Sequence, residues 1–144
     1  TEATTTSTTS VDLVTVSSLT IAAIAPFEHW MAFRKTAGAA AQLQLGVKLN
    51  GTQITSNAGA SGGGNAAEQG IGYQQIAPRV TSYLRGVQGW LTSAPSPTHR
   101  YWDATGGNDI ANATITELIY TALVGDALIT GGVDEAHVYS LATS

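Results

Sequence analysis

The chain offers few groups for covalent chemistry. Its 144 residues include three histidines, ten acidic residues and no cysteine. The lack of cysteine excludes a thiol nucleophile, a thiolate metal site and a disulfide framework. Nucleophilic hydrolysis needs a serine activated by a histidine and a carboxylate, and glycoside hydrolysis needs a pair of carboxylates. The sequence singles out neither set, so we predict no catalytic residue and no enzymatic activity.

Phosphate and metal binding are the next chemistries to consider. The glycine run at residues 62–64 is not followed by the lysine of a nucleotide-binding loop. Asp134, Glu135 and His137 are the best local group for a metal, but only two of them share one face of a strand. We therefore predict no cofactor and no metal, and a calcium ion held between loops stays open as an alternative.

Aromatic side chains are the remaining candidates for binding. Rings at strand positions usually belong to a core or a subunit interface, whereas exposed rings can stack on the apolar faces of sugars. Tyr101 and Trp102 follow Arg100 and a proline-rich turn, so we predict that they are exposed and bind a partner. A sugar platform is the alternative, and its candidates are Trp30, Trp90, Trp102, Tyr73, Tyr83, Tyr101 and Tyr120.

Charge and hydropathy exclude two classes of partner. Six basic residues against ten acidic ones give a net charge of −4, which offers no basic surface for nucleic acid. No apolar run approaches the roughly 18 residues that a membrane-spanning helix needs. Only 11% of the residues are charged and 43% are hydrophobic. A surface with so few charges loses little solvation free energy when it packs against a neighbouring subunit.

The N-terminal segment differs in composition from the rest of the chain. Residues 1–10 hold eight threonines and serines and no large apolar side chain. We predict that they form a flexible arm, followed by a single domain over residues 11–144. Threonine favours extended backbone, which can join a sheet edge on a partner. The arm residues predicted to bind that partner are Thr4, Thr5, Thr6, Thr8 and Thr9.

The first half of the domain has the pattern of strands. Residues 11–21 predict one or two strands with a kink near Ser17 and Ser18. Residues 27–36 and 39–50 alternate between apolar and other side chains with period 2. In the first of these the predicted inner face holds Phe27, His29, Met31 and Phe33. Asn50-Gly51 then predicts a tight hairpin turn into a strand over residues 52–56.

Glycine and proline divide the second half. Residues 57–72 contain six glycines and predict a long mobile loop. Pro78 is predicted at an edge or bulge position. A helix is the competing interpretation of residues 115–124, but their threonines and β-branched side chains favour a strand. Further strands are predicted at 73–85, 87–92, 113–123, 127–130 and 137–141, and turns at 94–97, 103–108, 125–126 and 131–132.

The number and spacing of these segments predict the fold class. Eight to ten short strands, 8–15 residues apart, are typical of an antiparallel β-sandwich. We predict an all-β, jelly-roll-like sandwich with the flexible N-terminal arm attached. Because few charges protect its strand edges, we also predict a homotrimer in which neighbouring copies cover them.

Several segments together resemble a known class of proteins. They are Arg-Lys-Thr-Ala-Gly at 34–38, Gln-Leu-Gln-Leu-Gly-Val-Lys-Leu-Asn-Gly-Thr at 42–52, Ala-Leu-Ile-Thr at 127–130 and Ala-His-Val-Tyr-Ser-Leu at 136–141. In style, most of residues 11–144 resembles the small β-sandwich proteins of tailed-bacteriophage virions, particularly capsid decoration (cement) proteins. The resemblance implies a non-enzymatic virion protein on the capsid surface that binds the major capsid protein, often as a trimer, with a terminal arm gripping the shell.

Two other classes remain open. One is a receptor- or carbohydrate-binding module of a phage fibre or an extracellular, cell-surface protein. The other is a filament subunit. An exposed row of tryptophan and tyrosine would favour the binding module, and a strand missing from the sandwich would favour the filament subunit.

Overall fold

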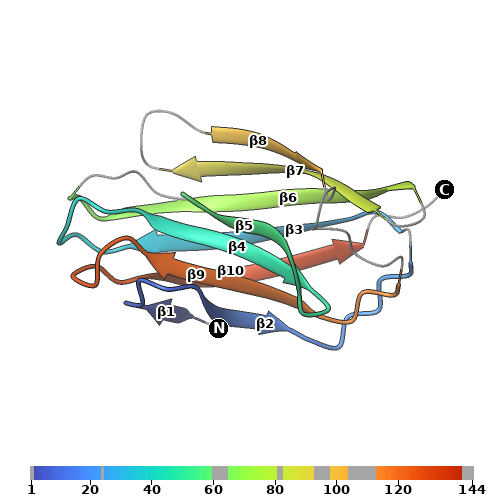
Figure 1. The fold of residues 1–144 in the computed structure, drawn as a ribbon, viewed down its shortest axis with the longest axis horizontal. Helices are drawn as coiled ribbons and strands as arrows, with labels where there is room; N and C mark the ends of the chain where they lie inside the picture. Colours follow the sequence, from blue (N-terminus) through green and yellow to red (C-terminus); the bar gives the residue numbers. More distant parts are fainter. Residues whose placement is uncertain are drawn as a thin grey trace.

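The computed structural model describes residues 2–23, 25–59, 65–80, 83–92, 98–103 and 113–140 (Figure 1). Within these ranges the chain forms β-strands and no helix, so no helix there could cross a membrane. The strands are β1 (Ala3–Thr5), β2 (Val11–Val16), β3 (Phe27–Lys35), β4 (Leu43–Leu49), β5 (Thr52–Gly59), β6 (Glu68–Val80), β7 (Tyr83–Thr92), β8 (Thr98–Asp103), β9 (Leu118–Val124) and β10 (Gly131–Ser140).

The strands form two antiparallel sheets. One has six strands in the order β1-β10-β3-β6-β7-β8, and the other has four in the order β2-β9-β4-β5. All neighbouring pairs run antiparallel. Buried side chains from both sheets share one hydrophobic core. The predicted all-β, antiparallel sandwich is therefore confirmed.

Alternation along the strands decides which side chains enter the core. On β3 every second residue is buried and the residues between them are partly or fully exposed, as period 2 requires. The inner face that this creates comprises Phe27, His29, Met31, Phe33 and Lys35. On β4 the buried set includes Leu43, Leu45, Val47 and Leu49. Both predicted inner faces are confirmed, although β4 begins at Leu43 and not at residue 39.

The competing helix over residues 115–124 does not form. This segment contains β9, which lies between β2 and β4 in the four-stranded sheet. Six of its seven residues are buried, including Tyr120 and Thr121. Because residues on both faces of β9 are buried, its hydrophobicity does not alternate with period 2. This explains why its sequence also suited a helical period.

The predicted hairpin turn between β4 and β5 is confirmed. Asn50 and Gly51 have φ angles of 47° and 78°, and two central residues with positive φ are the signature of the turn that matches strand twist. Asn50 also holds a distant segment. Its Oδ1 accepts hydrogen bonds from the backbone N–H of Thr116 at 2.9 Å and of Glu117 at 3.3 Å, and its Nδ2 donates to the carbonyl of Thr114 at 2.9 Å.

Replacing Asn50 with alanine should lower the free energy of unfolding by about 1–3 kcal/mol, because it removes these bonds and strains a positive-φ position. Urea denaturation measures the change. Asn50→Gly serves as the control, since glycine accepts this φ without strain and isolates the contribution of the side-chain bonds. Wild-type stability in Asn50→Gly would mean that the side-chain bonds contribute nothing.

Two predicted segments differ in the structure. Residues 57–72 were predicted as a loop, but β5 extends to Gly59 and β6 begins at Glu68, while residues 60–64 lie outside the described ranges. Gly70 and Gly72 lie inside β6, where β3 and β7 pair with their backbone from both sides. Backbone pairing needs no side chain, so a glycine-rich stretch can form an inner strand.

The C-terminal turn is also displaced. Gly131 and Gly132, predicted as a turn, begin β10, and the predicted strand at 127–130 belongs to the preceding turn region. Residues 98–103, for which no strand was predicted, form β8. The predicted turns at 94–97 and beyond Asp103 lie outside the described residues.

A register shift between Pro78 and Val80 confirms the irregularity predicted at Pro78.

Candidate functional site

The N-terminal arm lies on the domain itself. Thr4 and Thr5 belong to β1, which pairs with Gly132 and Gly131 at the edge of β10. Three residues of the predicted flexible arm therefore pair with the sheet of the same chain. The arm lacks large apolar side chains, but pairing at a sheet edge uses only backbone N–H and C=O groups. The other predicted partner-binding threonines, Thr6, Thr8 and Thr9, are exposed on the connection to β2.

Gly132 makes this close approach possible. A Cβ atom at Gly132 would lie 2.1 Å from the carbonyl oxygen of Ala3 and 2.8 Å from the Cα of Thr4. Both contacts are with backbone atoms, which cannot move aside as the end of a side chain can. The edge of β10 is thus shaped for the backbone of β1 at this position.

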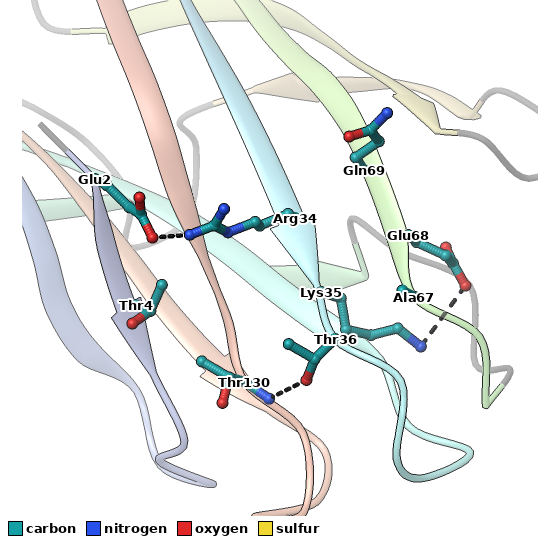
Figure 2. Close-up of a pocket in the computed structure, with 9 residues that line it drawn as sticks. All are labelled: Glu2, Thr4, Arg34, Lys35, Thr36, Ala67, Glu68, Gln69 and Thr130. Carbon is teal, nitrogen blue, oxygen red and sulfur yellow. Dashed lines mark hydrogen bonds and ion pairs between the residues drawn. The ribbon is translucent and has the colours of Figure 1, made fainter.

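A pocket of about 660 Å³, lined mostly by polar and charged residue types, lies beside the arm, and its lining includes residues of β1, of the end of β3 and of the start of β6 (Figure 2). Arg34 of β3 reaches toward β1 and forms an ion pair with Glu2 (Figure 2). Its Nε also lies 3.2 Å from Oδ1 of Asp134, next to the register shift in β10. The lining residues are Glu2, Thr4, Arg34, Lys35, Thr36, Ala67, Glu68, Gln69 and Thr130.

Lys35 is a buried cation in the wall of this pocket. Its Nζ lies 3.7 Å from a carboxylate oxygen of Glu68, the residue opposite it on β6, and donates to the carbonyl of Ala41 at 3.1 Å. Burying an ammonium group costs several kcal/mol unless a carboxylate and hydrogen bonds compensate. Sequence analysis missed this group, although period 2 along β3 already places residue 35 on the inner face.

A second candidate surface lies on the outer face of the six-stranded sheet. His137 of β10, Trp30 of β3 and Tyr73 of β6 occupy one register row across three strands, which we call the outer aromatic row. The rings of Trp30 and Tyr73 stack, with centroids 5.1 Å apart and planes at 28°. Trp30 is 36% exposed, and the neighbouring Tyr139 and Ile71 are 50% and 44% exposed. An apolar patch open to solvent is typical of a binding surface.

Polar groups border the outer aromatic row. Glu28 and Gln75 are register partners beside it, and Gln75 Nε2 donates to Glu28 Oε2 at 3.3 Å. At the other side, His137 Nε2 lies 3.6 Å from a carboxylate oxygen of Glu135. These groups can form hydrogen bonds with whatever covers the rings.

The other predicted aromatic candidates lie elsewhere. Tyr120 is fully buried, so its candidacy for a sugar platform is wrong. Tyr101 and Trp102 belong to β8, where their backbones pair with Val87 and Gly86. Their side chains, like those of Trp90 and Tyr83, lie outside the described part of the structure.

Buried polar groups also occur inside the core. His29 Nε2 lies 2.6 Å from Gln74 Oε1, and the hydroxyl of Tyr120 lies 3.0 Å from His29 Nδ1. A neutral imidazole satisfies both contacts when Nε2–H donates to Gln74 and Nδ1 accepts from Tyr120. Burial lowers the pKa of His29 to about 4, and the hydrogen bond that His29 makes to the Gln74 amide oxygen opposes this shift by raising the pKa. Burial likewise raises the pKa of Tyr120 above its ordinary value. The contact between His29 of β3 and Tyr120 of β9 joins the two sheets, and these side chains are not accessible to solvent.

In the described ranges, no three histidine, cysteine or acidic residues gather closely enough to hold a metal ion. Of the predicted metal candidates, Asp134 contacts Arg34, and Glu135 contacts His137. The glycine run 62–64 lies outside those ranges. The described residues therefore offer two surfaces for non-covalent binding: the pocket under the arm and the outer aromatic row.

Comparison with known proteins identifies no family for this sequence. No family model matches this sequence, and no curated protein matches it either.

Proposed function

We propose that the chain is a non-enzymatic structural protein of a virus particle, which binds the outside of a shell built by a major capsid protein and stabilises it. The observation that carries the proposal is the outer aromatic row, a set of partly exposed rings on the outer face of the six-stranded sheet. Aromatic residues are enriched, and charged residues depleted, at the centre of protein interfaces. The resemblance to capsid decoration proteins supplies the class of partner.

The order of the strands also supports the proposal. With β7 and β8 set aside, the remaining strands form the orders β1-β10-β3-β6 and β2-β9-β4-β5. Consecutive strands then alternate between the sheets except at the β4–β5 hairpin. This is the order of two Greek keys wrapped into a jelly roll, an architecture common in viral capsid proteins. We infer a jelly roll with β7 and β8 added at one edge.

Assembly into a homotrimer is part of the proposal. Four edge strands, β1, β8, β2 and β5, end the two sheets in the described part of the chain, and unpaired edges favour contact with other chains. Few charges on the surface keep the desolvation cost of such contacts low.

The proposal predicts that the chain is found on particles and binds them through the outer aromatic row. Particles from cells that encode the chain are stripped of it and then incubated with wild-type protein or with Trp30→Ala/Tyr73→Ala. Loss of two central rings should weaken binding by about 30-fold, the effect of removing hot-spot side chains. Co-sedimentation measures the affinity, and Leu128→Ala, a change at an exposed site outside the row, should bind like wild type.

Absence of the chain from purified particles would contradict the proposal, as would full affinity of the double variant.

The second candidate, a carbohydrate-binding module, is favoured by the stacked Trp30 and Tyr73 with Glu28 and Gln75 beside them. Rings offer apolar faces to a sugar, and a carboxylate and an amide can bind its hydroxyls. Sugar-induced fluorescence changes that disappear in Trp30→Phe would favour this candidate, provided that the chain is absent from particles.

A further inference from the structure

We propose that β1 exchanges between copies, so that the arm of one chain pairs with β10 of a second copy. The edge of β10 that pairs with the arm is specific for it. Gly131, Gly132 and Val133 pair with Thr5, Thr4 and Ala3 in turn. Gly132 admits the arm only because it has no side chain. Arg34, opposite Gly132 on β3, holds the carboxylate of Glu2.

The contacts that hold the arm are few and lie at the surface. β1 has three residues, and both partners of the Glu2–Arg34 ion pair are about half exposed. An ion pair at the surface contributes little to stability. Ala3 and Thr5 are only partly buried, so no large apolar side chain has to leave the core when β1 is released.

The segment that joins β1 to β2 can act as the hinge. Thr6, Thr8, Thr9 and Ser10 are exposed. Ser7 and Thr9 form hydrogen bonds with each other inside this segment. The backbone N–H of Val124 in β9 also donates to the Ser7 carbonyl at 2.9 Å. Extended, residues 2–10 span about 30 Å, enough to reach the edge of an adjacent copy.

A second copy is the occupant that fits the vacated edge. It carries the same Glu2 for Arg34 and the same Thr4 opposite Gly132, so every contact made within one chain is made again between chains. The balance between the two arrangements then depends on concentration and geometry and not on new contacts. β1 and β2 lie next to each other at one edge of the sandwich (Figure 1), so an arm that leaves exposes the edge of β10 to another chain.

Two full-length variants separate donor from acceptor. In the edge-blocked variant, Gly132→Ala, the added Cβ collides with the backbone of Ala3, but the arm is intact. In the arm-blocked variant, Glu2→Arg/Thr4→Pro, Arg34 repels the new arginine, and the proline prevents full backbone pairing with β10. The edge of β10 is intact in this variant. Circular dichroism and thermal melting first show that each variant is folded.

Mixing the two variants should produce a complex that neither forms alone. In native mass spectrometry at tens of micromolar protein, we expect a 1:1 species. Hydrogen exchange at residues 131–133 of the arm-blocked chain should slow when the edge-blocked chain is added. Adding Glu2→Gln to the edge-blocked chain should weaken the complex by about 2- to 5-fold, as expected for a half-exposed ion pair. Unchanged exchange at residues 131–133 up to millimolar concentration would overturn the proposal.

The wild-type chain provides a second test if either variant is unfolded. Sedimentation velocity should show association that grows with concentration, persists in Leu128→Ala, a change at an exposed site outside the arm and β10, and is reduced in Glu2→Arg. Association that Glu2→Arg leaves unchanged would contradict exchange through the arm. The proposal does not rest on the virion function, because neither test involves a particle or a sugar.

Discussion

Phe33→Ala is expected to lower the free energy of unfolding by about 3–5 kcal/mol. Phe33 is 1% exposed on the inner face of β3 and belongs to the core shared by both sheets. Removing its ring takes away buried apolar surface and leaves a cavity that the paired strands cannot close. Guanidinium denaturation measures the change, with the denaturant slope checked for an altered unfolded state.

Leu128→Ala is the matched control for this loss. Leu128 is 76% exposed in the turn region before β10, and its replacement should change stability by no more than about 0.5 kcal/mol. A loss of less than about 1 kcal/mol in Phe33→Ala would contradict the packing of the two sheets on a common core. Where the alanine variant fails to fold, Phe33→Leu provides a milder substitution with the same expected direction.

Acidification is expected to cost about 3 kcal/mol of stability through His29 alone. The pKa of His29 is lowered from 6.5 to about 4 in the folded protein, mainly by burial. Between these two values the unfolded chain binds a proton that the folded chain does not. Stability is therefore fully present above pH 6.5 and is lost as the pH falls toward 4. Each pKa unit corresponds to 1.36 kcal/mol, which gives the expected loss.

Unfolding free energies measured at several pH values between 7 and 4 test this expectation. His29→Gln should flatten the decrease over that window, because the titrating group is gone. His137→Gln, at a histidine that is about half exposed in the outer aromatic row, should retain the wild-type decrease. An equal decrease in wild type and His29→Gln would show that carboxylates and not His29 cause it. The His29 ring resonances, followed by NMR, give an independent measurement of its pKa.

The local features of this protein are predictable from the sequence. Alternation between residues 27 and 33 assigned the inner face of β3 correctly, and the same period extends to Lys35. Asn50-Gly51 marked its hairpin because the positive φ angles of that turn are a property of two residues. Side-chain direction along a strand and the preferred φ of a turn are set by neighbours in the chain. They require no knowledge of the remaining fold.

The glycine-rich segments show where local rules fail. Gly70, Gly72, Gly131 and Gly132 suggested loops and turns, yet all four lie in strands. Their conformational freedom favours no particular structure, so the decision comes from partners. β6 has a strand on each side, and β10 lies between β1 and β3. Hydrogen bonding with those neighbours offsets the weak strand preference of glycine.

Only the tertiary structure decided which groups meet at the candidate sites. Trp30 stacks on Tyr73, Lys35 faces Glu68, and Arg34 reaches Glu2 because β3 lies between β10 and β6 in one particular register. A shift of one residue in any of these pairings would turn the same side chains to opposite faces of the sheet. Register is selected by the burial of all inner faces together, across strands far apart in the chain. The sequence by itself determined which side chains each strand presents, and the packing of the whole sandwich determined what they touch.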